Sequence, residues 1–475
     1  MRHIINFFLL ILLSANLFAQ NKFPLVTDYY HLKLSFDFKE ELMKGSCEMK
    51  IENESDTTFI QIPVLLYRLM KVESVQNQAN ENLSFTQSVT QFEDFPKLQA
   101  NYIVIQEKIL PYETKIIKIH YSGYLLGYEE TGMRYKKDKI SPDFTIIRND
   151  AYSYPVIGKP SISFLRENIA AHYFEYKIEV TVPDSLIVAN GGILESIRKY
   201  ENNLSTFQYA SKKPNWRIDI AIAPYKKLFG DRLEIFYITD SLAAADIADY
   251  GEKAMSLYTY WWGELKNKNT ITVIETEKGS GGQTDETTIL LPEEAFTSKN
   301  DYEYLYHELS HLWNVKIAEE KGLSPRWEEG LATFCQYLVT EKLNPEKAGL
   351  VKRASNNVLK RLKSNFEKNP KLLNTPMFEF GNEQLTNYSY TQAMVMFSVL
   401  YYWLGEESFN QAISGFYQKY YKAGTTTRDF TNYWEKSMPS ERLKNFFNDW
   451  VYGTEYTTFI LNDRSIDEII NHYKL

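Results

Sequence analysis

Apolar and polar residues alternate in several short runs between Tyr29 and about Tyr225. The alternation is clearest in four runs, at positions 30–38, 115–121, 174–182 and 216–223. A period of two sends successive side chains to opposite faces of a β-strand. Turn residues such as Asn190 and Gly191 separate the runs. The pattern predicts an all-β, antiparallel domain over residues 20–228.

The spacing of apolar residues changes after this point. Three short apolar runs, at 233–238, 271–274 and 288–291, predict strands. One longer run, at 243–265, predicts a helix. Beyond Pro292 the apolar residues recur with helical spacing. We therefore predict a second, α+β and mostly helical domain over residues 229–455, followed by a carboxy-terminal tail at 456–475.

The first nineteen residues have the pattern of a signal peptide. Arg2 and His3 precede an apolar run at 4–13, and small and polar residues follow up to Ala19. Such a run is too short to span a bilayer comfortably, and its flanks are those of a cleaved leader. We expect cleavage after Ala19 and a secreted or periplasmic protein. No later run has 18 consecutive apolar residues, so no membrane association is expected after cleavage.

Composition and charge narrow the possible partners. Of the 475 residues, 44% are hydrophobic and 24% are charged, as in ordinary folded proteins. The net charge of -8 argues against a nucleic-acid partner. Cys47 and Cys335 fall in different predicted domains, and Cys335 lies in a helical pattern, so free buried thiols are favoured over a disulfide.

A candidate metal motif lies at residues 307–311, which read His-Glu-Leu-Ser-His. On a helix, positions i and i+4 share a face, so His307 and His311 can reach one metal ion. Glu308 is then placed to bond a water on the metal rather than the metal itself. The helix is predicted over 302–316, with Asn300 or Asp301 at its start.

A catalytic zinc site takes three protein ligands and keeps one position open. Ser324 suits a helix N-cap and Pro325 the first helical position, so a second helix is predicted to start there. Glu329 falls in its early turns, where an acidic side chain is tolerated. We predict one Zn²⁺ per chain, bound by His307, His311 and Glu329. The alternative is a surface helix with two solvated histidines.

At these residues the chain resembles the aminopeptidase N and leukotriene-hydrolase family of zinc peptidases, or gluzincins. The segment Trp327-Glu328-Glu329-Gly330-Leu331-Ala332 is similar to the family's third-ligand segment, with Glu329 in the ligand place. The resemblance implies a saddle-like amino-terminal β domain and a thermolysin-like catalytic domain over 231–455. It also implies a form without the family's large helical carboxy-terminal domain.

The resemblance extends to further site residues. It implies that Tyr390 stabilises an oxyanion, with Tyr388 as the competing candidate. It implies that the edge strand that binds substrate contains Gly281, Gly282, Gln283 and Thr284. Thr284 stands where the family has the Glu that binds a free amino group; Asp285 or Glu286 could substitute for it.

The expected function is an exported zinc peptidase that cleaves short peptides. The missing amino-group anchor leaves two alternatives open, an endopeptidase or blocked-peptide hydrolase, and a peptide-binding protein without turnover. A structural protein without metal is the remaining alternative. Glu319 and Glu320 are possible partners that orient the two histidines.

Overall fold

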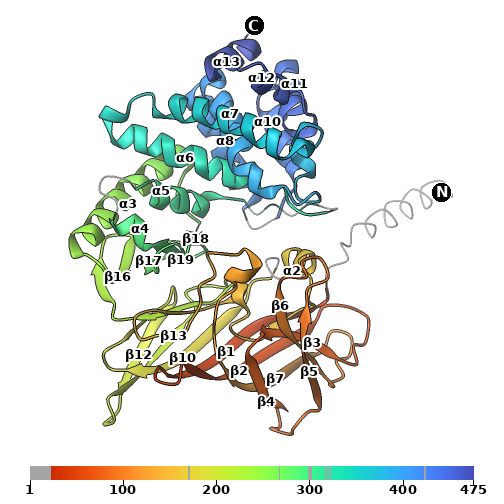
Figure 1. Cartoon of the computed structure of the whole chain (residues 1–475), viewed down its shortest axis with the longest axis vertical. Coiled ribbons are helices and arrows are strands. Elements are labelled where there is room, and N and C mark those ends of the chain that lie inside the picture. The colour runs from red at the N-terminus through yellow and green to blue at the C-terminus, as the bar shows by residue number, and fades with distance from the viewer. Residues whose placement is uncertain are drawn as a thin grey trace, which may run out of the picture.

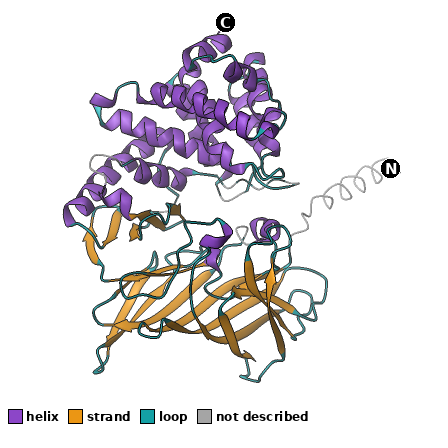
Figure 2. Cartoon of the chain, in the orientation of Figure 1, coloured by secondary structure: helices purple, strands orange, loops and turns teal. Residues whose placement is uncertain are grey.

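The structure is a computed structural model that describes residues 23–168, 172–266, 268–297, 302–315, 317, 319, 322–421 and 424–474. The predicted leader, Asn300, Asp301 and Glu320 lie outside the described residues. A β-rich amino-terminal part and a helical carboxy-terminal part lie on opposite sides of a small sheet region (Figures 1 and 2). This arrangement confirms the predicted fold class. Among the described residues, no helix has the length and apolar character needed to cross a bilayer.

A seven-stranded sheet forms the body of the amino-terminal part. In spatial order its strands are β12 (Ile193–Lys199), β13 (Leu204–Ala210), β10 (Glu175–Pro183), β1 (Leu25–Asp37), β2 (Leu42–Asn53), β7 (Thr114–Gly123) and β4 (Met70–Asn77). The predicted alternation is visible in β1, where Leu32 and Leu34 are buried and Lys33 and Ser35 are not.

One strand pair in this sheet corrects the antiparallel prediction. β1 and β10 run parallel, with Tyr29 opposite Glu175 and Ser35 opposite Thr181. Parallel neighbours need a long connection, and the chain between them builds a smaller sheet of four strands and contributes one strand to another sheet of three strands. The four-stranded sheet has the order β5 (Phe85–Gln91), β6 (Gln99–Ile105), β3 (Ile62–Tyr67) and β9 (Val156–Ile157). The three-stranded sheet has the order β11 (Ile187–Ala189), β14 (Asp219–Ala223) and β8 (Thr145–Arg148). Alternation within a run cannot reveal which distant strand lies beside it.

A five-stranded sheet begins the second part. Its order is β15 (Lys226–Phe229), β16 (Leu233–Tyr237), β17 (Ile271–Thr276), β19 (Thr288–Pro292) and β18 (Gln283–Thr284). β16, β17 and β19 run parallel, and α3 (Ser241–Trp262) connects the first two. β18 is antiparallel to β19 and forms the edge of the sheet.

The remaining chain is helical. The helices are α4 (Glu293–Thr297), α5 (Glu303–Ser310), α6 (Trp327–Leu343), α7 (Leu350–Lys368), α8 (Ser389–Leu404), α9 (Glu406–Tyr420), α10 (Thr427–Ser437), α11 (Glu441–Phe447), α12 (Tyr456–Leu461) and α13 (Ile466–Lys474). Twelve of the sixteen side chains of α8 are buried, so this helix lies at the centre of the bundle.

The carboxy-terminal segment 456–475 contains two short helices. α12 and α13 pack on the bundle and bury Tyr456, Ile466, Ile469, Ile470 and Tyr473. The last four of these follow helical spacing, so the sequence did contain the signal for a packed helix. Cys47 and Cys335 are both free and buried, as predicted.

Candidate metal centre

Three predicted ligands from two packed helices meet at one point. His307 lies on α5, His311 begins the tight 3₁₀ turn that follows it, and Glu329 lies in the first turn of α6. The Nε2 atoms of the two histidines each lie 3.5 Å from Oε2 of Glu329. The three candidate ligand atoms all lie within 4.8 Å of one another.

The helix that carries both histidines is shorter than predicted. It ends at Ser310, and the 3₁₀ turn His311–Trp313 follows. Asn314 then adopts an extended conformation, which stops the helix before the predicted end at 316. Leu305 and Leu309 are fully buried and fix the rotation of α5, so that His307 and His311 face α6.

The second helix begins later than predicted. Ser324 and Pro325 precede it, because Arg326 takes a left-handed conformation with φ of 59° and the helix starts at Trp327. The hydroxyl of Ser324 accepts from the Arg326 N–H at 3.1 Å, which closes a local turn instead of capping the helix. Trp327 fixes the start: its indole N–H donates to Thr427, and its ring centroid lies 4.1 Å from that of Phe430.

Side-chain amides orient both imidazoles from behind. The Nδ1 of His307 lies 3.1 Å from Oε1 of Gln336, to which it can donate, leaving Nε2 free for a metal. The amide of Asn314 lies against Nδ1 of His311. The atom nearest to Nδ1 is the amide nitrogen; for a metal to bind at Nε2, the ring proton would lie on Nδ1 and the amide would have to turn its oxygen toward the ring.

These partners were not predicted from the sequence. Gln336 lies two helical turns after Glu329 on the same face, and this spacing is the signal that could have identified it. Glu319 and Glu320 were the possible partners; the Glu319 carboxylate accepts from Thr427 N at 2.9 Å, at the start of α10.

The donor set fits zinc. Burial alone would raise the pKa of Glu329, but Arg326 and the two imidazoles hold it well below its usual value, so the group is a carboxylate. Two imidazole nitrogens and one carboxylate oxygen are a known ligand set of catalytic zinc sites.

The carboxylate of Glu308 lies against the edge strand. Its Oε2 accepts from the Thr284 hydroxyl at 2.6 Å. A Cβ atom on Gly282 would lie 2.2 Å from Oε1 of Glu308, so any larger residue here would displace the Glu308 carboxylate from its observed position. Gly281 has φ of 72°, in the left-handed region that favours glycine, and leads the chain into β18.

Of the two candidate tyrosines, Tyr390 reaches the metal ligands. Its ring lies parallel to that of His307, with centroids 6.3 Å apart. Burial, together with the Glu329 carboxylate to which the phenol donates, raises the pKa of Tyr390 far above its usual value. Tyr388 precedes α8 and packs on the hydrophobic core of the bundle.

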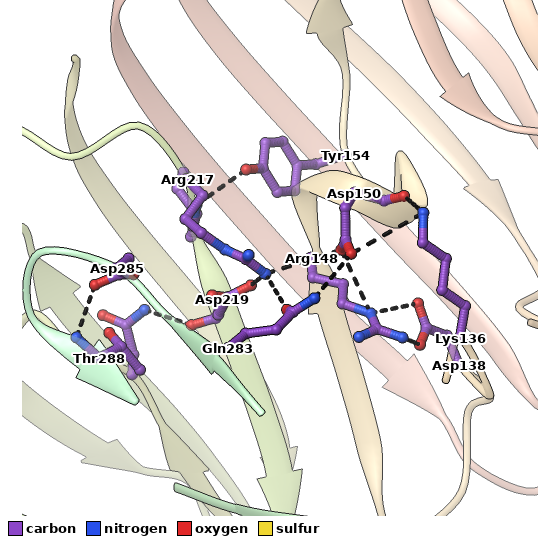
Figure 3. A network of polar contacts seen from close by, with 12 residues as sticks. Lys136, Asp138, Arg148, Asp150, Tyr154, Arg217, Asp219, Gln283, Asp285 and Thr288 are labelled. Carbon is purple, nitrogen blue, oxygen red and sulfur yellow. Dashed lines mark hydrogen bonds and ion pairs between the residues drawn. The ribbon is translucent and has the colours of Figure 1, made fainter. Parts of the chain in front are cut away.

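Gln283 points to the other face of the edge strand, as alternation requires. Figure 3 shows it between Arg217 and Asp150 of the β-rich part. Its Oε1 accepts from Arg217 at 2.8 Å, and its Nε2 donates to Asp150 at 3.2 Å. Gln283 thus ties the edge strand to the neighbouring domain.

A buried network of charges continues from this contact. Arg148 donates to both oxygens of Asp138, at 3.1 and 2.5 Å, and Arg217 pairs with Asp219. Lys136, Arg148 and Arg217 balance Asp138, Asp150 and Asp219. Gln283 and Asp150 lie 133 positions apart in the sequence, so no local pattern predicts their contact.

Asp285 and Glu286, the possible substitutes for an amino-group anchor, both bond within the protein. Asp285 is buried and accepts from the backbone N–H groups of Thr287 and Thr288 at 2.6 and 2.7 Å. Burial, with a contribution from Asp219, raises its pKa to about 6. Glu286 forms an ion pair with Lys213.

Residues 282–450 match the Peptidase family M1 domain. No curated protein matches the chain. Among solved structures, the M1 zinc metallopeptidase from Deinococcus radiodurans is similar, with a TM-score of 0.62, 15% sequence identity, and coverage of 90% of this chain and 94% of that one.

Related structures give the same fold. A mutant of the Deinococcus enzyme bound to the substrate Tyr-Ser-Ala has a TM-score of 0.62. A mutant two-domain M1 zinc metallopeptidase bound to L-arginine has a TM-score of 0.60. Both are 15% identical, with the same coverage. The chain therefore carries a Peptidase family M1 domain and is a zinc metallopeptidase with the fold of the two-domain M1 enzymes.

Proposed function

We propose that this chain hydrolyses peptide bonds with one zinc ion held by His307, His311 and Glu329. The observation that carries the proposal is the convergence of their three ligand atoms within 4.8 Å. The Deinococcus enzyme with Tyr-Ser-Ala bound as substrate supports a peptide substrate. The metal content and activity of variants at these positions test the proposal.

Glu308 is the proposed general base. A zinc ion at this site supplies Lewis acidity, which polarises a carbonyl group and makes a nearby water more acidic. Thr284 occupies Oε2 of Glu308, so Oε1 is the oxygen that takes the proton from the attacking water. The protonated carboxyl then delivers that proton to the leaving amine. The contacts with Thr284 and Gly282 hold the carboxylate for both transfers.

Tyr390 is the proposed donor to the oxyanion of the tetrahedral intermediate. Its raised pKa keeps the phenol protonated, as a hydrogen-bond donor must be. Tyr390→Phe should lower kcat by about 10²–10³ with little change in KM, because one oxyanion donor is lost. Steady-state kinetics test this. Tyr388→Phe is the matched control and should keep activity; the reverse outcome would reassign the role to Tyr388.

Substrate binding along the edge strand is the simplest arrangement for a peptide. β18 pairs with β19 on one side only, and a strand edge can accept an extended peptide through main-chain hydrogen bonds. Gly281, Gly282, Gln283 and Thr284 would then contribute main-chain groups. This favours substrates in extended conformation.

A second candidate function is cleavage that does not depend on a free amino terminus. Thr284, Asp285 and Glu286 are all bonded to other protein groups, so this segment offers no spare carboxylate to an ammonium group. We expect acetylation of a short peptide's amino terminus to change kcat/KM by less than about tenfold. A buried ammonium–carboxylate pair would cost at least about 2 kcal/mol, or roughly 30-fold, when lost. A loss of that size would favour an aminopeptidase.

We further propose that the protein is exported and loses its first nineteen residues. The support is the charged, apolar and small-residue order of residues 1–19. Amino-terminal sequencing of the mature protein should begin at Gln20. A mature protein that retains Met1 would contradict export by this leader.

A further inference from the structure

Arg326 has an unusual backbone conformation directly beside the metal ligands. Its φ and ψ are 59° and 40°, in the left-handed region that non-glycine residues rarely adopt. The residue immediately precedes α6, and its carbonyl accepts from the Glu329 N–H at 3.2 Å. This turn brings the Arg326 side chain over the first turn of α6, where Glu329 lies.

The two oxygens of Glu329 have different partners, and the Tyr390 phenol is a further donor to the same carboxylate. Oε2 faces both imidazoles at 3.5 Å. Oε1 accepts from the Arg326 guanidinium. The guanidinium carbon also lies 6.0 Å from the centroid of the Tyr390 ring, a second contact that fixes its position. A carboxylate held by one oxygen presents the other in a single direction.

We propose that Arg326 is a positioning residue that makes Glu329 a one-oxygen ligand. The guanidinium occupies Oε1 and thereby directs Oε2 to the point that His307 and His311 share. The inference rests on the proposed zinc site and concerns how tightly this chain holds the ion. Arg326 acts through Glu329, and no contact of its own with the metal is required.

The charge of Glu329 explains why a cationic side chain is suited to position 326. Glu329 is almost fully buried, and its pKa is held well below the usual value, so it carries a negative charge in a place that little solvent reaches. A buried carboxylate needs a bonded partner. The Arg326 side chain keeps 38% of its surface exposed, so its own charge remains partly hydrated.

The variant Arg326→Gly distinguishes an effect on the position of Glu329 from an effect on folding. Glycine adopts the observed φ without strain, so the metal-free variant should unfold at the same temperature as the native chain or a higher one. Its dissociation constant for zinc should rise by about 10–100-fold, as for other partners that orient a ligand. Arg326→Lys, which can still donate to Oε1, should recover most of the affinity.

The measurement is zinc competition against a chelator of known affinity, with thermal unfolding of the metal-free proteins alongside. Arg353→Ala is the control, because Arg353 donates to backbone carbonyls near the start of α7, away from the metal ligands. Equal zinc affinity in Arg326→Gly and the native chain would overturn the proposal. Should that variant instead raise KM for peptide acids but not for peptide amides, with zinc affinity unchanged, Arg326 would bind the substrate's carboxylate. Absence of zinc binding by the native chain would reject the zinc site itself.

Discussion

Replacing Glu308 with Gln should abolish measurable peptide hydrolysis while the protein keeps its zinc. Gln has the same shape, and its amide oxygen can still accept from Thr284, but it cannot take a proton from water. General acid–base groups contribute about 10²–10⁴-fold to rate. Glu308 is not one of the three clustered ligands, so the metal content should stay at the native level. Peptide cleavage followed by mass spectrometry measures the loss.

The control for this variant is Glu346→Gln, the same change at an exposed residue before α7. It should have native activity. Hydrolysis by Glu308→Gln at the native rate would eliminate the proposed base. If the native chain bound peptides at full zinc occupancy without cleaving them, the protein would be a peptide-binding protein without turnover.

The buried network beside the edge strand predicts the second large effect. Arg148→Ala should destabilise the chain by about 3–5 kcal/mol, since it leaves a buried carboxylate without its partner. The Arg148 and Asp138 side chains are only 2% and 1% exposed. Because so little solvent reaches the pair, burial raises the pKa of Asp138 even beside Arg148. Denaturant unfolding measures the change.

A double variant distinguishes the charge effect from lost packing. Arg148→Met combined with Asp138→Leu removes one cation and one anion and leaves Lys136, Arg217, Asp150 and Asp219 balanced. It should recover at least half of the lost stability, because buried pairs can often be replaced by apolar residues at little cost. A single variant that costs less than about 1 kcal/mol, as for an exposed pair, would contradict the account.

The sequence predicted those parts of the site that local geometry determines. The i, i+4 spacing of His307 and His311 on a helix is sufficient to place them together. The acidic residue at the start of the next helix predicted Glu329 as the third ligand. The alternation of apolar residues likewise predicted the strands of the β-rich part. Each of these signals lies within a few turns or one strand.

Features that depend on distant contacts were not predictable in this way. The Ser324-Pro325 pair has the chemistry of a helix start, but the anchoring of Trp327 on Phe430 and Thr427 sets a later one. The contact of Gln283 with Arg217 joins the edge strand to the segment before β14 in the other domain. The parallel pairing of β1 with β10 depends on the path of the chain between them. In each case tertiary contacts outweigh a local preference.

The central claim is that His307, His311 and Glu329 bind one zinc ion. The most direct measurement is the metal content of the purified protein by plasma mass spectrometry, with the double variant His307→Ala/Glu329→Ala beside it. The account predicts about one zinc per native chain and almost none in the variant, because a single imidazole does not hold zinc in place of three ligands. A native chain without zinc, or a variant that retains it, would contradict the claim.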